Sequence, residues 1–311
     1  MGKGIRFPLA ALLAVLLMTG MLTGCSPGTP GEGGSSSGGE TGDVRLYLAP
    51  EDYPRVDGST VTIPLSEAFA ATVMHLSIEE ARQYILHNKT HSAYINLVDR
   101  KADIIFVTSP SEEELTYAKD SGIELEVVPI VSEGFVFLAS SDNPVDGLSL
   151  QQIRDIYSGK IINWKDVGGA DKKIIAYQRP ENSGSQTGML DLVMGSDGIM
   201  EAPTEKVIAE MGGLVDAVAV YTNEEDAIGY SYYYYVTDMW LNDKVKLLAV
   251  DGVYPDKETV SDGSYPIRTA YYAVLRSDEP KDSNARKLLE WILSKQGQQI
   301  AEEAGYVKLG K

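Results

Sequence analysis

The stretch Arg179-Pro-Glu-Asn-Ser-Gly-Ser-Gln-Thr187 is the most informative part of this sequence, because nine residues combine a cation, three hydroxyl groups and a glycine. Residues 173–177 before it alternate in hydropathy like a strand, and residues 187–194 after it have the pattern of an amphipathic helix. A strand, a turn rich in glycine and hydroxyl groups, and a helix start therefore follow in order. The first N–H groups of a helix lack carbonyl partners and carry partial positive charge, so this turn is suited to an anion.

Arg179 adds a cation that stays protonated and can bind two oxygen atoms of an anion at once. The other interpretation is structural: the serines cap the helix, and Arg179 pairs with a surface carboxylate. The stretch alone does not separate the two interpretations, because its residues are common in turns. The rest of the chain has to decide between them.

The N-terminus has the pattern of a targeting signal, with a basic start, an apolar core over residues 9–18 and the small-residue sequence Leu22-Thr-Gly-Cys25. This pattern resembles a bacterial lipoprotein box. We therefore expect a signal peptide over residues 1–24 and lipidation of Cys25, which would hold the protein at the extracytoplasmic face of the cell membrane. Residues 25–42 are rich in glycine and serine and predict a flexible tether.

Composition excludes several classes of function. Cys25 is the only cysteine among 311 residues, so an intramolecular disulfide, a thiolate nucleophile in the folded body and a thiolate zinc cluster are excluded. The formal net charge of −18 argues against nucleic acid as a partner. Neither a G-x-x-x-x-G-K-[ST] loop nor a G-x-G-x-x-G turn is present, so nucleotide binding has no support.

Strands and helices alternate after the tether, which predicts an α/β fold with a mainly parallel sheet. A strand at 44–49, a polar turn at 57–60 and a helix toward Met74 form a second unit like the one around Arg179. Further strands are expected at 103–107, 123–130, 134–139, 214–220, 228–236, 245–250 and 266–275, and helices at 77–87, 93–100, 111–120, 150–157 and 282–305. Ligands of open α/β sheets bind beyond the carboxyl ends of strands, where both hydroxyl-rich turns lie.

Several different short motifs follow one another through most of the chain after the tether: Gly58-Ser-Thr60, Ala102-Asp-Ile-Ile-Phe106, Ile156-Tyr-Ser-Gly-Lys-Ile-Ile-Asn-Trp164, Asp166-Val-Gly-Gly169, the Arg179 stretch, Ile228-Gly-Tyr230, Gly297-Gln-Gln-Ile300 and Gly305-Tyr-Val-Lys-Leu309. Together they resemble the periplasmic phosphate-binding protein family, the substrate-binding lipoproteins of phosphate ABC transporters. Each motif alone is weak evidence, but their order and spacing are specific.

The resemblance implies a two-lobed periplasmic-binding-protein fold, in which each lobe is a mainly parallel sheet flanked by helices and two strands cross between the lobes. We expect the crossings at 134–139 and 266–275. Lobe I would then combine residues 43–138 with 267–311, and lobe II would comprise residues 139–266. The ligand would lie between lobes that close as a hinge and exclude water, which strengthens charged hydrogen bonds to an ion.

The resemblance also assigns the phosphate contacts: Ser59, Thr60, the N–H of Val61, Thr90, Arg179, Glu181, Ser183, Gly184 and Ser185. Arg179 resembles the family's phosphate-binding arginine. Glu181 occupies a position where the family commonly has Asp, and an acceptor there would favour phosphate, which keeps a proton near neutral pH, over sulfate, which has none. The other interpretation of Glu181 is a solvated loop carboxylate.

Two segments depart from the family pattern. Val107-Thr108-Ser109-Pro110 supplies only hydroxyls where the family often has a carboxylate or an arginine, and Thr90-His-Ser92 lacks the usual glycine-rich loop. His87 and His91 stand four residues apart, but an expected helix break between them argues against a metal site. The tyrosines at 232–235 are interpreted as packing residues of a strand rather than as a platform for sugars.

We expect a binding protein without catalysis, because no G-x-S-x-G elbow surrounds Ser185 and no histidine stands in an obvious general-base position. No cofactor or metal is indicated. The leading hypothesis is a monomeric lipoprotein that captures inorganic phosphate and delivers it to an ABC permease. The alternatives are a binding protein for another oxyanion or a small organic anion, and a surface-tethered sensor or adhesion module.

Overall fold

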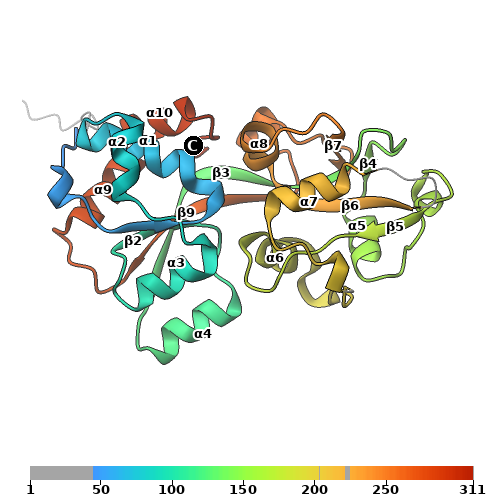
Figure 1. Cartoon of the computed structure of the whole chain (residues 1–311), viewed down its shortest axis with the longest axis horizontal. Helices are drawn as coiled ribbons and strands as arrows, with labels where there is room; N and C mark the ends of the chain where they lie inside the picture. Colours follow the sequence, from blue (N-terminus) through green and yellow to red (C-terminus); the bar gives the residue numbers. More distant parts are fainter. Residues whose placement is uncertain (1–44, 203, 221–224, 311) are drawn as a thin grey trace, which may run out of the picture. The chain divides into compact units, whose positions relative to one another are not determined.

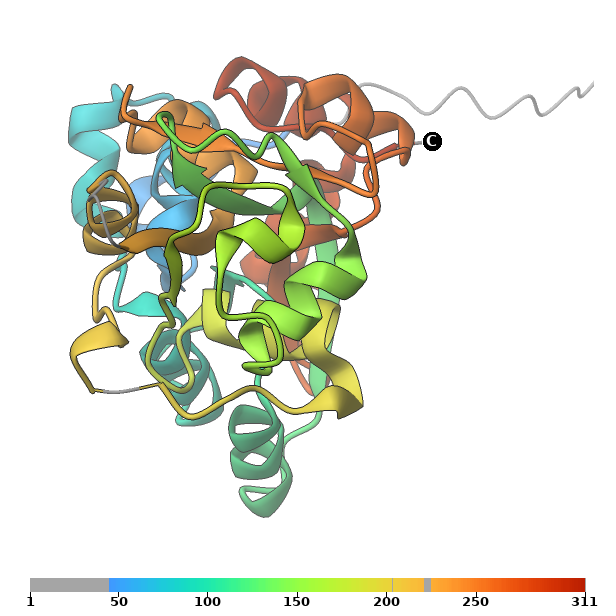
Figure 2. The same ribbon diagram turned by 90° about the vertical axis from the view of Figure 1, so that its right-hand side faces the viewer.

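A computed structural model describes residues 45–202, 204–220 and 225–310, which form a two-lobed α/β fold (Figure 1). The helices of the first lobe are α1 (Ile63–Met74), α2 (Ile78–Ala81), α3 (Lys89–Val98), α4 (Glu112–Asp120), α9 (Asn284–Leu293) and α10 (Lys295–Glu303). Those of the second lobe are α5 (Leu150–Tyr157), α6 (Gly184–Gly188), α7 (Met211–Val218) and α8 (Lys257–Asp262). Figure 2 views the fold from the side of the second lobe.

The strands are β1 (Val56–Gly58), β2 (Ile104–Val107), β3 (Leu125–Ser140), β4 (Gly147–Leu148), β5 (Lys173–Ala176), β6 (Glu225–Tyr232), β7 (Val245–Leu247), β8 (Ala249–Val250) and β9 (Arg268–Arg276). Among the described residues, β1-β2-β9-β3-β6-β5 lie side by side in one sheet, in which β7 also pairs with β3, and β4 pairs with β8. Short 3-10 and π segments are η1 (Pro50–Asp52), η2 (Thr60–Thr62), η3 (Arg82–Tyr84), η4 (Trp164–Val167), η5 (Met189–Met194), η6 (Gly195–Asp197), η7 (Thr204–Lys206) and η8 (Tyr235–Met239).

Strand β3 belongs to both lobes. Its first part pairs with β9 as far as Gly134, and from Phe135 onward it pairs with β6. The sequence predicted two strands here, but the structure has one. The register shifts between Pro129 and Val131, because proline has no N–H to offer the ladder, and pairing then resumes.

The sheet is mixed, whereas the sequence led us to expect a mainly parallel one. Parallel pairing joins β1 to β2, β5 to β6 and β4 to β8, while β3 and β9 run antiparallel to their neighbours. The α/β class and the two lobes are confirmed. The antiparallel pairs arise because the long strands that cross between the lobes lie next to each other in the centre of the sheet.

Three further local predictions were wrong. The strand expected at 228–236 ends at Tyr232, and Tyr235 begins the π segment η8 instead of lying on that strand. Residues 45–49 form no strand; the Leu48 N–H donates instead to the Val73 carbonyl oxygen of α1 (3.1 Å), and the first strand is β1, where a turn was expected. Residues 211–218 form helix α7 rather than a strand. The apolar residues of α7 that face the core, Leu214, Val215 and Val218, have helical spacing, but so short an apolar run does not separate helix from strand.

A buried carboxylate stands where β3 changes partners. Glu133 is 2% exposed, and its Oε1 atom accepts hydrogen bonds from the N–H groups of Gly134 (2.8 Å) and Tyr234 (3.3 Å). Burial raises the pKa of Glu133 to about 7, although these hydrogen bonds act in the opposite direction. Glu133 thus joins the crossing strand to the end of β6.

The predicted signal peptide, Cys25 and the tether lie outside the described residues. Within the described residues, no single helix is long and apolar enough to cross a membrane. The segments Thr60–Met74 and Ile78–Tyr84 reach the required length and composition only when taken together across a bend of 101°.

We predict that Glu133→Gln flattens the pH dependence of stability. The folded state keeps the Glu133 proton up to about pH 7, whereas the unfolded chain releases it near its ordinary pKa. The stabilisation is therefore complete below the unfolded pKa and is lost as the pH rises through 7. Urea unfolding across this range should show a decrease in the wild-type free energy that the variant lacks, on the order of 3 kcal/mol. The exposed Glu124→Gln is the control, and an unchanged slope in Glu133→Gln would contradict the prediction.

Candidate functional site

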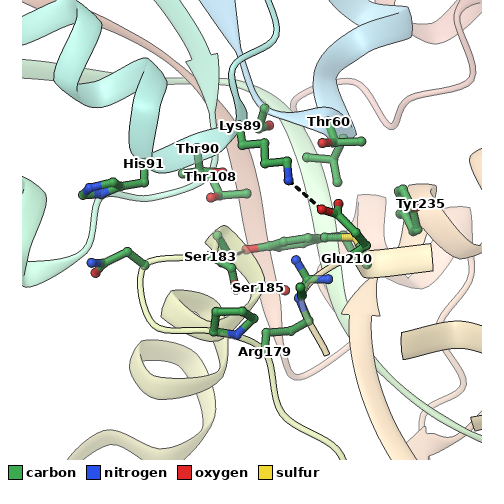
Figure 3. Close-up of a pocket in the computed structure, with 18 of the residues that line it drawn as sticks. Thr60, Lys89, Thr90, His91, Thr108, Arg179, Ser183, Ser185, Glu210 and Tyr235 are labelled. Atoms are coloured by element: carbon green, nitrogen blue, oxygen red, sulfur yellow. Dashed lines mark hydrogen bonds and ion pairs between the residues drawn. The ribbon is translucent and has the colours of Figure 1, made fainter. Parts of the chain in front are cut away.

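A cavity of about 570 Å³ lies between the two lobes (Figure 3). All nine residues predicted to contact a ligand line it: Ser59, Thr60, Val61, Thr90, Arg179, Glu181, Ser183, Gly184 and Ser185. Thr60, Thr90 and Thr108 come from the first lobe, and they face Arg179, Ser183 and Ser185 of the second lobe across the cavity. The two hydroxyl-rich turns of the sequence therefore meet at one place.

The first-lobe side is organised by a turn between β1 and α1. The Ser59 N–H donates to the carbonyl oxygen of Phe106 in β2 (2.9 Å), which fixes the turn beside the end of that strand. Pro64 stands in the first turn of α1, where its missing N–H costs nothing. The helix thus begins at the cavity, with its first N–H groups on that side.

One buried carboxylate fixes this turn relative to Thr90. Asp57 is 1% exposed, and its oxygens accept hydrogen bonds from the N–H of Gly58 (2.7 Å), the N–H of Asn88 (2.9 Å) and the side-chain amides of Asn88 (2.9 Å) and Asn96 (2.8 Å). Gly58 precedes the turn, and Asn88 precedes α3, which carries Thr90. The two segments that supply first-lobe hydroxyls are therefore held by the same side chain.

The second-lobe side begins just after β5. The Arg179 N–H donates to the Tyr230 hydroxyl (2.9 Å) and to Gln186 Oε1 (3.1 Å), and Tyr230 in turn donates to Gln186. Tyr230 packs among the aromatic rings of Phe135, Phe137 and Tyr157 in the core. The backbone of Arg179 is therefore anchored to the centre of the lobe.

Ser183 and Ser185 have different roles. Helix α6 begins at Gly184, three residues earlier than the sequence predicted, and Ser183 is its N-cap, accepting from the Gln186 N–H (3.3 Å). The structural interpretation of the serines is thus correct for Ser183. Ser185 is fully buried, and its Oγ has no hydrogen-bond partner among the described residues.

Arg179 is a buried cation without an acidic partner in the part of the chain that the structure describes. Arg179 is 8% exposed, and its Nε and Nη1 atoms have no hydrogen-bond partner among the described residues. Burial lowers the pKa of the guanidinium below its ordinary value, only partly opposed by Tyr230 and Glu210. Thr108 Oγ1, also in the cavity wall, meets the geometric criteria for a hydrogen bond with no described residue, although Tyr232 lies beside it. A desolvated cation and unpaired hydroxyls are costly unless a ligand completes them.

Known proteins match this chain over most of its length. The sequence profile of the PBP superfamily domain matches residues 56–296. The chain belongs to the PBP superfamily. The phosphate-binding protein PstS of Bacillus subtilis is 30% identical over 197 residues, which are 60% of this chain and 59% of that protein. The phosphate-binding protein PstS of Staphylococcus saprophyticus is 26% identical over 290 residues, 90% of this chain and 85% of that protein.

Solved structures agree with this membership. A candidate phosphate ABC transporter substrate-binding protein from Clostridium perfringens, solved with bound phosphate, is 26% identical and has a TM-score of 0.63. The match covers 82% of this chain and 98% of that one. An ABC-type phosphate transport receptor from Vibrio cholerae, 22% identical with a TM-score of 0.60 over 81% of this chain and 98% of that one, shares the fold. The family indicated by the sequence motifs is confirmed.

In this PBP-superfamily chain the lobes touch at Gly184. A Cβ atom at this position would lie 2.2 Å from Thr108 Oγ1 and 2.8 Å from Thr90 Oγ1, so only glycine fits without displacing them. The Tyr232 hydroxyl donates to the Gly184 carbonyl oxygen (2.7 Å), which fixes the backbone at the contact. The backbone of Gly184 in the second lobe and the side chains of Thr108 and Thr90 in the first lobe therefore close one side of the cavity.

Several residues that the sequence did not assign to the site also lie in its wall, among them Thr108, Lys89 and Glu210. Thr108 follows β2, where a ligand group is expected in an α/β sheet, so its position was a usable signal. Lys89 Nζ and Glu210 Oε1 form an ion pair across the cleft (2.7 Å; Figure 3). Nothing in the sequence connects these two residues, because 121 positions separate them.

Glu181 lines the cavity but is exposed, so it is not the buried acceptor that the sequence led us to expect. It lies in a turn closed by the Ser183 N–H and the Pro180 carbonyl oxygen (3.1 Å). His87 and His91 bind separate partners, Ser66 (2.8 Å) and Glu114 (3.1 Å). No group of three or more His, Cys, Asp or Glu suited to a metal occurs in the described ranges.

We predict that Gly184→Ala lowers the free energy of unfolding by about 1–3 kcal/mol, because the new methyl group overpacks the contact with Thr108 and Thr90. Gly213→Ala is the matched control, since its Cβ would meet only Ile208 Cγ2 at 3.2 Å and alanine is favoured within a helix. Urea unfolding measures both variants. Equal stability of the two would show that the lobes do not touch at Gly184.

Proposed function

We propose that this protein binds inorganic phosphate in the cavity between its lobes and delivers it to an ABC permease. The observation that supports this most strongly is the buried guanidinium of Arg179, whose Nε and Nη1 atoms have no hydrogen-bond partner among the described residues. The hydroxyls of Ser185 and Thr108, which line the same cavity, have none there either. These donors line one cavity without an acceptor among the described residues, and an oxyanion would supply the acceptors. The relatives named phosphate-binding protein, and the related structure with bound phosphate, support phosphate as that oxyanion.

The proposed contacts combine both lobes. Arg179 would bind two phosphate oxygens, and Ser185 and Thr108 would donate from opposite sides. The remaining contacts we propose are Ser59, Thr60, the N–H of Val61, Thr90, Ser183 and the N–H of Gly184, with Glu181 at the rim. Because Gly184 already lies against threonines of the first lobe, an ion here would touch both lobes at once and favour their closed arrangement.

We also propose where the protein acts and how its chain is divided. Residues 1–24 would act as a signal peptide and lipidated Cys25 as the anchor, which places the protein at the extracytoplasmic face of the membrane. The lobes would divide into residues 43–138 with 267–311 and residues 139–266. The protein would act as a monomer and carry out no catalysis, since the cavity presents donors for an anion.

Calorimetry with phosphate, sulfate and molybdate tests the ligand. We expect heat of binding with phosphate and much weaker or no heat with the other two ions. The absence of phosphate binding, or equal binding of sulfate, would overturn the assignment. Binding of molybdate alone would indicate a protein for a different oxyanion.

Arg179→Ala should separate ligand binding from folding. Removing an unpaired buried charge costs the free protein nothing or stabilises it, whereas the bound ion loses its charged partner. We expect phosphate affinity to decrease by about 3–5 kcal/mol, with no decrease in the stability of the free protein. Arg154→Ala is the control, because Arg154 donates to the Val193 carbonyl oxygen (2.6 Å) outside the cavity. Retained phosphate binding by Arg179→Ala would contradict the proposed site.

A further inference from the structure

The cavity has a second end that the phosphate site does not use. A tetrahedral oxyanion fills roughly two to three times the volume of a water molecule, which is about 30 Å³ in the liquid. The cavity measures about 570 Å³. Besides the donors, its lining includes residues at the start of α7 and residues in or just after η8: Met211, Gly212, Tyr235 and Trp240. Of these, Tyr235 lies apart from Ser183 and Ser185 in Figure 3. We call these four residues the aromatic end.

The size of the cavity does not result simply from lobes that stand apart. Gly184 already lies against Thr108 and Thr90, and Lys89 already reaches Glu210 across the cleft. These contacts join the lobes at two places, and the cavity has its volume of about 570 Å³ with both of them made.

The aromatic end is a built surface. The Trp240 ring lies directly over the backbone of Gly212, where a Cβ atom would come within 2.7–2.8 Å of it. The indole N–H donates to Asp216 Oδ1 (3.1 Å), and the ring stands parallel to that of Tyr235, with an interplanar angle of 6° and centroids 6.4 Å apart. Trp240 nevertheless remains 42% exposed. A large side chain is thus fixed in position with part of its surface uncovered.

Tyr235 connects the two ends. Tyr235 and Arg179 both line the cavity, and the Arg179 charge partly opposes the increase in the Tyr235 pKa that burial causes. A ligand held by Arg179 would therefore have this ring beside it. Because the Trp240 N–H already donates to Asp216, the Trp240 ring offers an inorganic ion only apolar surface.

We propose that the ligand class of this cavity includes phosphate monoesters whose organic substituent is apolar or aromatic. This inference rests on the proposed phosphate site: the phosphoryl group occupies the donor end at Arg179 and Ser185, and the substituent packs on Trp240 and Tyr235. Aromatic side chains bury large apolar areas and favour offset or edge-to-face contact with a second ring. The Lys89 ammonium pairs with Glu210 of the cavity wall, so the substituent does not meet Glu210 as an unpaired charge.

Phenyl phosphate and inorganic phosphate are the two probes, titrated by calorimetry into the full chain and its variants. The wild-type protein should bind phenyl phosphate at least as tightly as inorganic phosphate. Trp240→Ala should weaken phenyl phosphate binding by about tenfold, the scale of a lost aromatic contact, and leave inorganic phosphate within about twofold. Trp240→Phe should keep most of the affinity for phenyl phosphate. Leu241→Ala, at a neighbouring and more exposed apolar residue outside the cavity, should change neither ligand.

The outcomes distinguish the two proposals. If inorganic phosphate binds and phenyl phosphate does not, the cavity accepts only the bare ion and the inference is overturned, while the phosphate site stands. An equal loss of both ligands in Trp240→Ala also overturns it, since the ring would then only support the fold. If neither ligand binds the wild-type protein, the phosphate site itself is wrong. Binding of both ligands, with Arg179→Ala weakening both and Trp240→Ala only the ester, supports the inference.

Discussion

The cleft depends on one buried charge. The Arg179 guanidinium is removed from water without an acidic partner among the described residues, an arrangement that costs free energy in a protein interior. The surrounding structure holds it there all the same, because its backbone is tied to Tyr230 and Gln186, and Tyr230 belongs to the aromatic core. Among the described residues nothing compensates this charge, and a bound anion would do so. This is how a site is organised before its ligand arrives.

Much of the site could be predicted from the sequence because its elements are local. The Arg179 stretch contains a strand end, a turn and a helix start within a few residues, and the turn at Ser59 repeats that order. The sequence therefore gives both the chemical groups of the site and their place in the fold. Contacts made across the cleft could not be predicted in this way. Lys89 pairs with Glu210 only because of the tertiary fold, and the exposure of Glu181 depends on the direction in which one turn leaves the lobe.

The errors in secondary structure have a common cause. Residues 45–49 and 211–218 are short apolar segments in which a strand and a helix give similar patterns, and contacts with distant elements decide between them. The buried polar strand β1 was missed for the opposite reason. Asp57 has the composition of a turn, yet its carboxylate is fully used inside the protein by Asn88 and Asn96.

Strand β3 sets a limit on how such a chain could have been assembled or divided. Most two-part proteins keep their halves on separate pieces of backbone, and each half can be inherited or produced alone. Here one uninterrupted strand supplies hydrogen-bonding partners to β9 in the first lobe and to β6 in the second. A cut on either side of it would leave one sheet with a bare edge, open to pairing with other chains. The two lobes therefore have to be inherited together, and a recombination that exchanged one lobe between relatives would also have to exchange β3.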